Sequence, residues 1–189
     1  MDIDVPEDIE SWDMITVPSC WQHQGYERPW YTNQNYPFPV DPPYVPDDNP
    51  CGVYERSFQI SETWSDRETY LVLEGVSSCA FVYVNDEYVG YTQGSHLQAE
   101  FELTKYVHKG HNRLRIKVLK WCVGSYLEDQ DFFRCSGIFR DVYLYGKPVA
   151  HVEDLWAKAG LEEDYSTGNL VIEAKVSGAA AQVEWQLDR

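Results

Sequence analysis

Hydrophobic and polar positions alternate along several short segments of the chain, most clearly from Arg113 to Val118. Basic and apolar residues alternate there, so one face of the segment is expected to face a core and the other the solvent. Similar segments, rich in β-branched and aromatic residues, recur at the roughly eight- to twelve-residue spacing that is typical of all-β proteins. We predict strands at residues 70–73, 80–84, 87–91, 113–120 and 138–145.

Turn signals separate these segments and predict how they connect. The pair Asn85 and Asp86 stands between two predicted strands. Both residue types tolerate positive φ, so a tight hairpin is expected at this point. No segment keeps a helical period with caps. The pattern therefore predicts an all-β fold, a jelly-roll antiparallel β-sandwich over residues 53–148.

The two ends of the chain have a different residue pattern from this middle region. Residues 1–52 are predicted to form an extended arm packed on the sandwich, because proline fixes φ and removes a main-chain donor. Six prolines fall close together there: Pro37, Pro39, Pro42, Pro43, Pro46 and Pro50. Residues 149–189 offer about three further strands, including 170–174 and 182–187, too few to bury a core of their own. We expect the chain to stop partway through a second β domain.

The net charge and the cysteines of the chain argue against several classes of function. A net charge of −16 argues against nucleic acid, whose phosphates need clustered Lys and Arg. The five cysteines form no CxxC pair, so we expect reduced thiols and neither a zinc site nor a disulfide framework. The acidic start lacks the pattern of a secretory signal, and no apolar stretch could span a bilayer. A soluble, cytoplasmic protein with no membrane partner is expected.

Aromatic residues make up 15% of the chain, and their rings could serve either a sandwich core or sugar stacking. The densest polar cluster is residues 124–131, in which Asp129 and Asp131 would project to the same side of an extended segment. Such a carboxylate pair suits a glycosidase or a hard cation. It could equally be structural, with the acids accepting hydrogen bonds from the main chain, Arg134 or Arg140. These residues alone leave the alternatives open.

Several runs of residues resemble the amino-terminal region of the large β-galactosidases of glycoside hydrolase family 2. The resemblance covers residues 17–148, in the family's order and spacing, and continues into the opening of its next, immunoglobulin-like domain. Its most specific runs are Ser-Tyr-Leu-Glu-Asp-Gln-Asp at 125–131 and Ser-Gly-Ile-Phe-Arg-Asp-Val at 136–142. Supporting runs are Val-Pro-Ser-Cys-Trp-Gln at 17–22, Gly-Tyr at 25–26, Tyr-Thr-Asn at 31–33, Asn-Pro at 49–50 and Tyr-Val-Gly-Tyr at 88–91.

The resemblance implies a galactose-binding-like jelly roll beside a TIM barrel that this chain lacks. Both catalytic glutamates of the family lie on that barrel, so the fragment is expected to be inactive and to hold no catalytic residue. Asn33 matches an asparagine that contacts the galactosyl hydroxyls. Asp131 matches an aspartate that ligates Na⁺ and touches the galactosyl 6-hydroxyl. An amide can donate and accept together, and a carboxylate suits a hard cation, so the residue types fit these roles.

The same resemblance implies the partners and ions of the full-length enzyme. They are a terminal β-D-galactoside such as lactose, the remaining domains of the chain, further copies in a homo-oligomer, Na⁺ through Asp131, and Mg²⁺. No ion is expected to bind the fragment tightly. Val123 departs from the family, whose best-known member has an aspartate there beside a peripheral Mg²⁺. Valine offers no oxygen, so that peripheral site is predicted to be lost or rebuilt.

Two other functions fit the same residues. A free-standing carbohydrate-binding module would use the same sandwich and aromatic content. A sandwich domain of a related β-glucuronidase or β-mannosidase is the third reading, and the runs at residues 31–33 and 128–131 argue against it.

Overall fold

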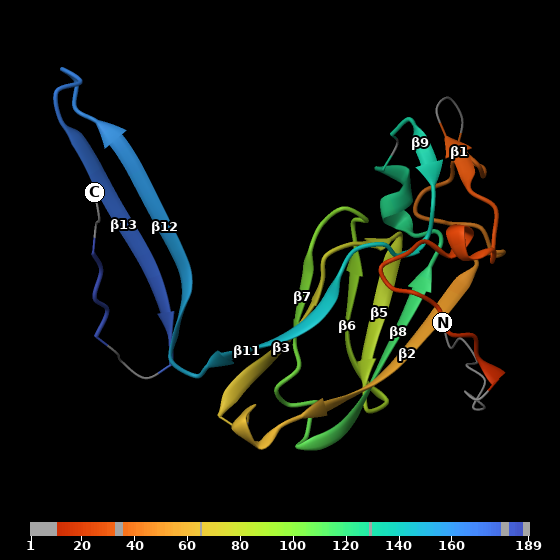
Figure 1. The fold of residues 1–189 in the computed structure, drawn as a ribbon. Helices are drawn as coiled ribbons and strands as arrows, with labels where there is room; N and C mark the ends of the chain where they lie inside the picture. Colours follow the sequence, from red (N-terminus) through yellow and green to blue (C-terminus); the bar gives the residue numbers. More distant parts are fainter. Residues whose placement is uncertain (1–10, 33–35, 65, 129, 179–181, 187–189) are drawn as a thin grey trace.

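The computed structural model describes residues 11–32, 36–64, 66–128, 130–178 and 182–186, and it is built almost wholly of β-strands. Two antiparallel sheets pack face to face in the main body (Figure 1). The four-stranded sheet has the order β2-β8-β5-β6, with bounds Cys51–Ile60, Gly110–Leu119, Cys79–Val84 and Glu87–Gln93. The three-stranded sheet has the order β11-β3-β7, with bounds Val142–Pro148, Arg67–Leu73 and Ala99–Glu102. The prediction of an all-β sandwich is confirmed.

Shorter elements complete the fold around the two sheets. β1 (Trp30–Thr32) pairs with β9 (Phe132–Arg134), and β4 (Val76–Ser77) pairs with β10 (Gly137–Ile138). The described residues also include three 3₁₀ turns. They are η2 (Trp21–Gln24) within the arm, η3 (Glu62–Trp64) after β2 and η4 (Val123–Tyr126) after β8. None of the helices in the described ranges is long and apolar enough to cross a membrane.

The core lies between the inner faces of the two sheets. In β8 the buried positions are Leu114, Ile116 and Val118, and the residues between them are partly exposed, so the predicted alternation is confirmed. From the other sheet Leu71 and Leu73 of β3 join the same cluster. Each of these five side chains is 8% exposed or less. Burying them stabilises the sandwich by roughly 1.5–3 kcal/mol per side chain.

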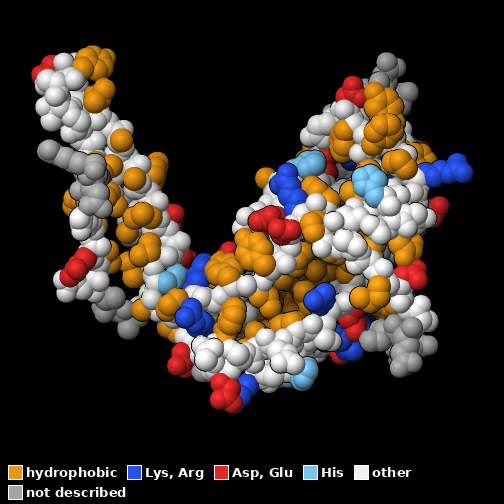
Figure 2. Space-filling view, viewed as in Figure 1, with side chains coloured by type: hydrophobic (Ala, Val, Ile, Leu, Met, Phe, Trp, Pro, Cys, Tyr) orange, Lys and Arg blue, Asp and Glu red, His pale blue; other side chains and the backbone are white. Residues whose placement is uncertain are grey.

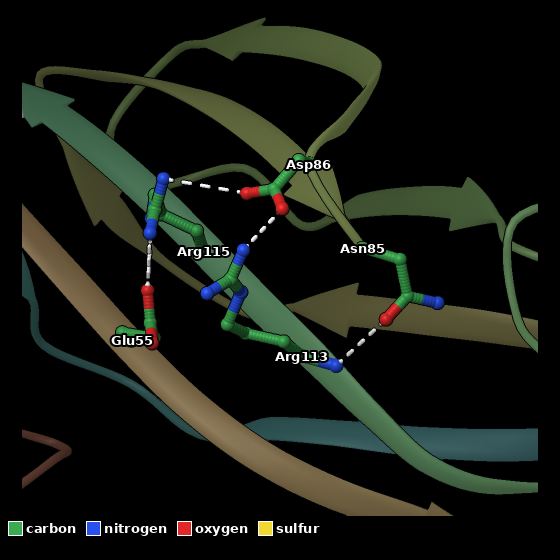
Figure 3. A network of polar contacts seen from close by, with 5 residues as sticks. All are labelled: Glu55, Asn85, Asp86, Arg113 and Arg115. Carbon is green, nitrogen blue, oxygen red and sulfur yellow. Dashed lines mark hydrogen bonds and ion pairs between the residues drawn. The ribbon is translucent and has the colours of Figure 1, made fainter. Parts of the chain in front are cut away.

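The polar face of β8 is held by charges from its neighbours (Figure 3). Arg115 bonds Glu55 of β2 at 2.7 Å and lies 3.5 Å from Asp86, which also pairs with Arg113. Asn85 accepts a hydrogen bond from the Arg113 main chain at 3.0 Å. Asn85 and Asp86 have φ of 51° and 67°, so the predicted tight hairpin between β5 and β6 is confirmed.

Two of the strand predictions need correction. The strand expected at 138–145 is split into β10 and β11, because the chain leaves its pairing with β4 at Ile138 and joins β3 at Val142. The strand expected at 182–187 is not seen, since residues 182–186 are described and have no strand pairing. A strand needs a partner for its main-chain hydrogen bonds, and the described chain offers none at that place.

A separate hairpin follows the sandwich. Among the described residues, β12 (His151–Leu161) pairs only with β13 (Gly168–Ser177), and Figure 1 shows this ribbon extending away from the main body. Its apolar side chains are exposed, for example Leu155 at 62% and Trp156 at 59%, and hydrophobic side chains run along it in Figure 2. The proposed domain boundaries at residues 52 and 148 stay predictions.

Candidate functional site

β1 of the amino-terminal arm and β9 meet in a short antiparallel ladder, although they lie far apart in the sequence. Trp30, Tyr31 and Thr32 pair with Arg134, Phe133 and Phe132. This β1-β9 ribbon stands outside the two main sheets, at one end of the sandwich (Figure 1). The sequence predicts an extended arm packed on the sandwich but not this ladder, because three residues are too few to show the alternation of a strand.

The two predicted sugar-contacting residues adjoin this ladder in the sequence. Asn33 follows Thr32 directly, but it lies outside the described residues. Asp131 is described; it is exposed and directly precedes Phe132. The main chains of Thr32 and Phe132 are partners in the ladder, so the neighbours of the two predicted residues stand opposite each other.

The acidic run before Asp131 is anchored rather than extended. η4 forms a tight turn in which the Cys122 main chain donates to Ser125 Oγ at 3.1 Å. Glu128 then accepts hydrogen bonds from the main chain and hydroxyl of Ser95, at 2.6 and 2.7 Å. Residues 123–127 are therefore not extended, and the expected projection of Asp129 and Asp131 to the same side stays a prediction. Asp129 lies outside the described residues.

Arg134 and Arg140 have roles of their own near this segment. The Arg134 side chain is buried and donates to the main-chain oxygens of Glu128 and Ser125, the latter at 3.3 Å. Its guanidinium also lies over the ring of Phe132, 5.3 Å from the centroid. Arg140 donates to the His96 main-chain oxygen at 3.4 Å. Arg134 therefore fixes the turn that leads to Asp131 by holding its carbonyl groups.

Aromatic rings hold the arm against the sandwich on both sides of Asn33. Before it, Trp30 meets Trp121 edge-on, with centroids 6.5 Å apart. After it, Phe38 packs against Trp121 at 5.0 Å and against Tyr126 at 5.4 Å. Edge-to-face pairs of this kind contribute about 0.5–1.5 kcal/mol each beyond their burial. Trp121, which precedes η4, and Tyr126, its last residue, thus form the surface on which the arm packs.

A charged pair beneath the arm was missed by sequence reasoning. Lys120 forms an ion pair with Glu27 of the arm, and only 2% of the Lys120 side chain is exposed. Its ammonium also lies over the rings of Trp30 and Trp121, at 5.3 and 5.2 Å. Burial lowers the pKa of Lys120 despite the attraction of Glu27. A signal was present, since Lys120 continues the period-two buried face of β8, where a charged residue needs a partner.

The opposite face of the β1-β9 ribbon presents two exposed rings. Tyr31 and Phe133 are 53% and 61% exposed, and their ring centroids lie 5.2 Å apart. Hydrophobic side chains gather at this end of the molecule in Figure 2. A pair of rings with a carboxylate two positions along the chain is an arrangement that can bind a sugar, through stacking and through acceptance of hydroxyl hydrogen bonds.

The described residues hold no metal-ligating cluster of three or more His, Cys, Asp or Glu side chains. Val123 is 48% exposed on η4 and offers no oxygen to a cation. Asp131 can supply a single carboxylate, whereas hard cations take about six or more oxygen ligands. Any cation at Asp131 would therefore need further oxygen ligands, such as main-chain carbonyls, water or groups from the rest of the parent protein.

Comparison with known proteins identifies the family that this chain resembles. The model for "Glycosyl hydrolases family 2, sugar binding domain" matches residues 2–148. The chain is 46% identical to a β-galactosidase of Actinobacillus pleuropneumoniae over 97% of its own length and 18% of that protein. It is also 46% identical to a β-galactosidase of Vibrio cholerae, over 93% of this chain and 17% of that protein. The chain therefore spans less than a fifth of these relatives.

Solved structures show the same fold at lower identity. A β-glucuronidase of Bacteroides uniformis superposes with a TM-score of 0.69 at 22% identity, covering 89% of this chain and 19% of that chain. A β-glucuronidase of an uncultured Clostridium species gives a TM-score of 0.57 at 26% identity, covering 67% of this chain and 24% of that chain. Because the family model covers most of its residues, this chain belongs to glycosyl hydrolase family 2 and carries that family's sugar-binding domain.

Proposed function

We propose that this chain is the non-catalytic sandwich of a retaining, cytoplasmic β-galactosidase, and that it lends Asn33 and Asp131 to a galactose subsite. The catalytic acids would lie on a barrel domain elsewhere in the parent protein. The observation that carries the proposal is the β1-β9 ladder, in which Thr32 is opposite Phe132. The motif residues that adjoin these two partners are the asparagine and the aspartate that the family resemblance assigns to galactose.

The proposed roles follow from the chemistry of each group. The Asn33 amide would donate to and accept from sugar hydroxyls. Asp131 is exposed and would accept a hydrogen bond from the galactosyl 6-hydroxyl and ligate Na⁺, with further oxygens from the parent's other domains. Contacts to hydroxyls that do not react would orient the scissile bond for the distant acids. Mg²⁺ would be held by the barrel, and a homo-oligomer is the expected state of the full-length enzyme.

The choice of a galactoside over a glucuronide rests on sequence identity. The two β-galactosidases are 46% identical to this chain, whereas the two superposed β-glucuronidases are 22% and 26% identical. The runs at residues 31–33 and 128–131, which resemble those of β-galactosidases, also favour a galactoside.

Kinetics of the full-length parent enzyme test the proposal. Asp131→Ala should raise KM for lactose at least tenfold and abolish activation by Na⁺, since each 1.4 kcal/mol of lost binding is a factor of ten. Asp86→Ala is the matched control, because Asp86 is an exposed acid on the distant β5-β6 turn. Equal kinetics for the two variants would refute the role of Asp131.

Calorimetry on the isolated chain separates this proposal from a free-standing carbohydrate-binding module. Titration with galactose and lactose should give no detectable heat, because half of the subsite lies on the missing barrel. Binding at millimolar affinity or better would favour the module, and the exposed Tyr31 and Phe133 would be its stacking rings.

A further inference from the structure

The turn that connects β6 to β7 lies against the segment that carries Asp131. It comprises residues 94–97, and the Leu97 main-chain N–H donates to the Gly94 main-chain oxygen at 3.0 Å. Gly94 has φ of +100°, a conformation that L side chains rarely adopt, and a Cβ there would stand 3.3 Å from the Leu97 side chain. The turn therefore has a specific shape, which the glycine permits.

Ser95, in the middle of this turn, directs both of its donors at one carboxylate. Its main-chain N–H donates to Glu128 Oε1 at 2.6 Å, and its hydroxyl donates to Glu128 Oε2 at 2.7 Å. Only 3% of Ser95 is exposed, so these bonds form where little water competes for them. Hydrogen bonds to an ionised acceptor are about twice as strong as neutral ones, and two of them together fix the orientation of the carboxylate.

The next residue of the turn contacts the chain on the other side of Asp131. The His96 ring meets the Phe132 ring edge-on, with centroids 6.3 Å apart, and it meets the Phe139 ring at 5.6 Å. Phe132 follows Asp131 directly, whereas Glu128 stands three residues before it. The turn therefore contacts this segment both before and after Asp131.

The main chain of Glu128 is hydrogen-bonded as well. Its N–H donates to the Gly124 main-chain oxygen at 3.2 Å, and its own oxygen accepts a hydrogen bond from the buried Arg134 side chain. Both carboxylate oxygens are bonded to Ser95. Because its polar groups are already engaged with the protein, Glu128 is suited to placing the chain and not to binding a sugar directly.

We infer that Glu128 is a positioning residue of the galactose subsite: bonded to Ser95, it holds the chain so that Asp131 can accept a hydrogen bond from the galactosyl 6-hydroxyl. The inference rests on the proposed function, which assigns that hydroxyl to Asp131. A hydrogen bond between two oxygens needs a distance of about 2.5–3.0 Å, so a shift of Asp131 by about 1 Å would break it. Loss of the Glu128 carboxylate should therefore weaken this contact although Asp131 itself is still present.

The substrate preference of the full-length parent enzyme tests this inference. The compound p-nitrophenyl β-D-fucoside differs from p-nitrophenyl β-D-galactoside only in lacking the 6-hydroxyl, so the ratio of kcat/KM for the two substrates reports the contact at that position. Both substrates are assayed on the same preparation at one sodium concentration, so any loss of folded enzyme cancels from the ratio. Glu128→Ala should lower the galactoside preference about fivefold or more, and Asp131→Ala about tenfold or more.

Conservative and matched variants separate positioning from general support of the fold. An amide keeps an acceptor for the Ser95 N–H and can donate to the Ser95 hydroxyl, so Glu128→Gln should retain the preference to within about twofold. Ser95→Ala removes one of the two bonds and should lower the preference about threefold. Glu55→Ala is the control, because the Glu55 carboxylate also accepts two hydrogen bonds, from Arg115 at 2.9 and 2.7 Å, but lies on the polar face of the sandwich. Its loss should lower stability and leave the preference unchanged.

The outcomes distinguish the inference from the proposed function. If Asp131→Ala lowers the preference but Glu128→Ala does not, Glu128 has no positioning role. If Asp131→Ala leaves the preference unchanged, the proposed function fails and the inference fails with it. In the double variant, Glu128→Ala should add nothing to the effect of Asp131→Ala, because both act through one contact, and an additional fall would contradict the inference. Should Glu128→Ala not fold, as circular dichroism would report, an unchanged preference in Ser95→Ala would overturn the inference.

Discussion

The ion pair between Lys120 and Glu27 holds the arm on the sandwich. We expect removal of the Glu27 charge to cost more free energy of unfolding than removal of the Lys120 charge. The Lys120 side chain is 2% exposed and Glu27 is 23% exposed. An unpaired charge costs more free energy where water cannot reach it. Glu27→Gln leaves a buried ammonium without its counter-ion and should lower the free energy of unfolding by about 3 kcal/mol.

Removing the lysine should cost less. Lys120→Met takes the buried charge away and keeps most of the apolar contact with Trp30 and Trp121. Glu27 remains partly solvated and still accepts a hydrogen bond from Gln22 at 2.8 Å. We expect a loss of about 1–2 kcal/mol, made up of the ion pair and the cation–π contacts.

Urea unfolding measures both values, and an exposed pair supplies the control. Lys109 and Glu62 are 66% and 79% exposed, so Lys109→Met should change stability by less than about 0.5 kcal/mol. Amide hydrogen exchange should also rise at residues 21–32 in Glu27→Gln, because the arm is released from the sandwich. The reasoning is refuted if Lys120→Met costs as much as Glu27→Gln, or if both behave like the surface control.

The remaining predictions concern a core leucine, two glycines and the pH dependence of stability. Leu71→Ala should lower the free energy of unfolding by about 3 kcal/mol in urea, because this side chain is fully buried. Gly137→Ala should cost about 3 kcal/mol or more by the same assay, since φ is +118° and a Cβ would lie 2.8 Å from a tyrosine hydroxyl. Gly25→Ala, with φ of +90° and open space around it, should cost only about 1–2 kcal/mol. Between about pH 6 and pH 9 the unfolded chain keeps a proton on Cys122 that the folded chain has released. The free energy of unfolding should therefore rise with pH in that window. This contribution should be lost as pH falls through 6. The pKa of Cys79 is raised in the folded chain, so this thiol opposes the rise only as pH approaches 9. Unfolding curves of Cys122→Ser that keep the full slope would contradict the assignment.

Local pattern was sufficient for much of the sandwich. The alternation from Arg113 to Val118 predicts β8, and the Asn85-Asp86 pair predicts the β5-β6 turn, because side-chain period and positive φ are properties of neighbouring residues. The motif at residues 125–131 likewise points to Asp131 through its resemblance to the family, and the role of Asp131 stays a prediction. These statements depend only on residues close together in the chain.

Only the tertiary structure determines the features that form where segments distant in the sequence come together. Short pieces such as β1 and β9 become strands only because each supplies the other's hydrogen bonds. The same holds for the break between β10 and β11, where the partner strand changes. The buried position of Lys120 indicates that it needs a partner, but only the fold shows that this partner is Glu27. Ser78 likewise reaches the Cys122 sulfur only through the fold. Amino-acid sequence thus determined the faces of the strands, and long-range pairing, which no local period encodes, determined which charges and polar groups lie together.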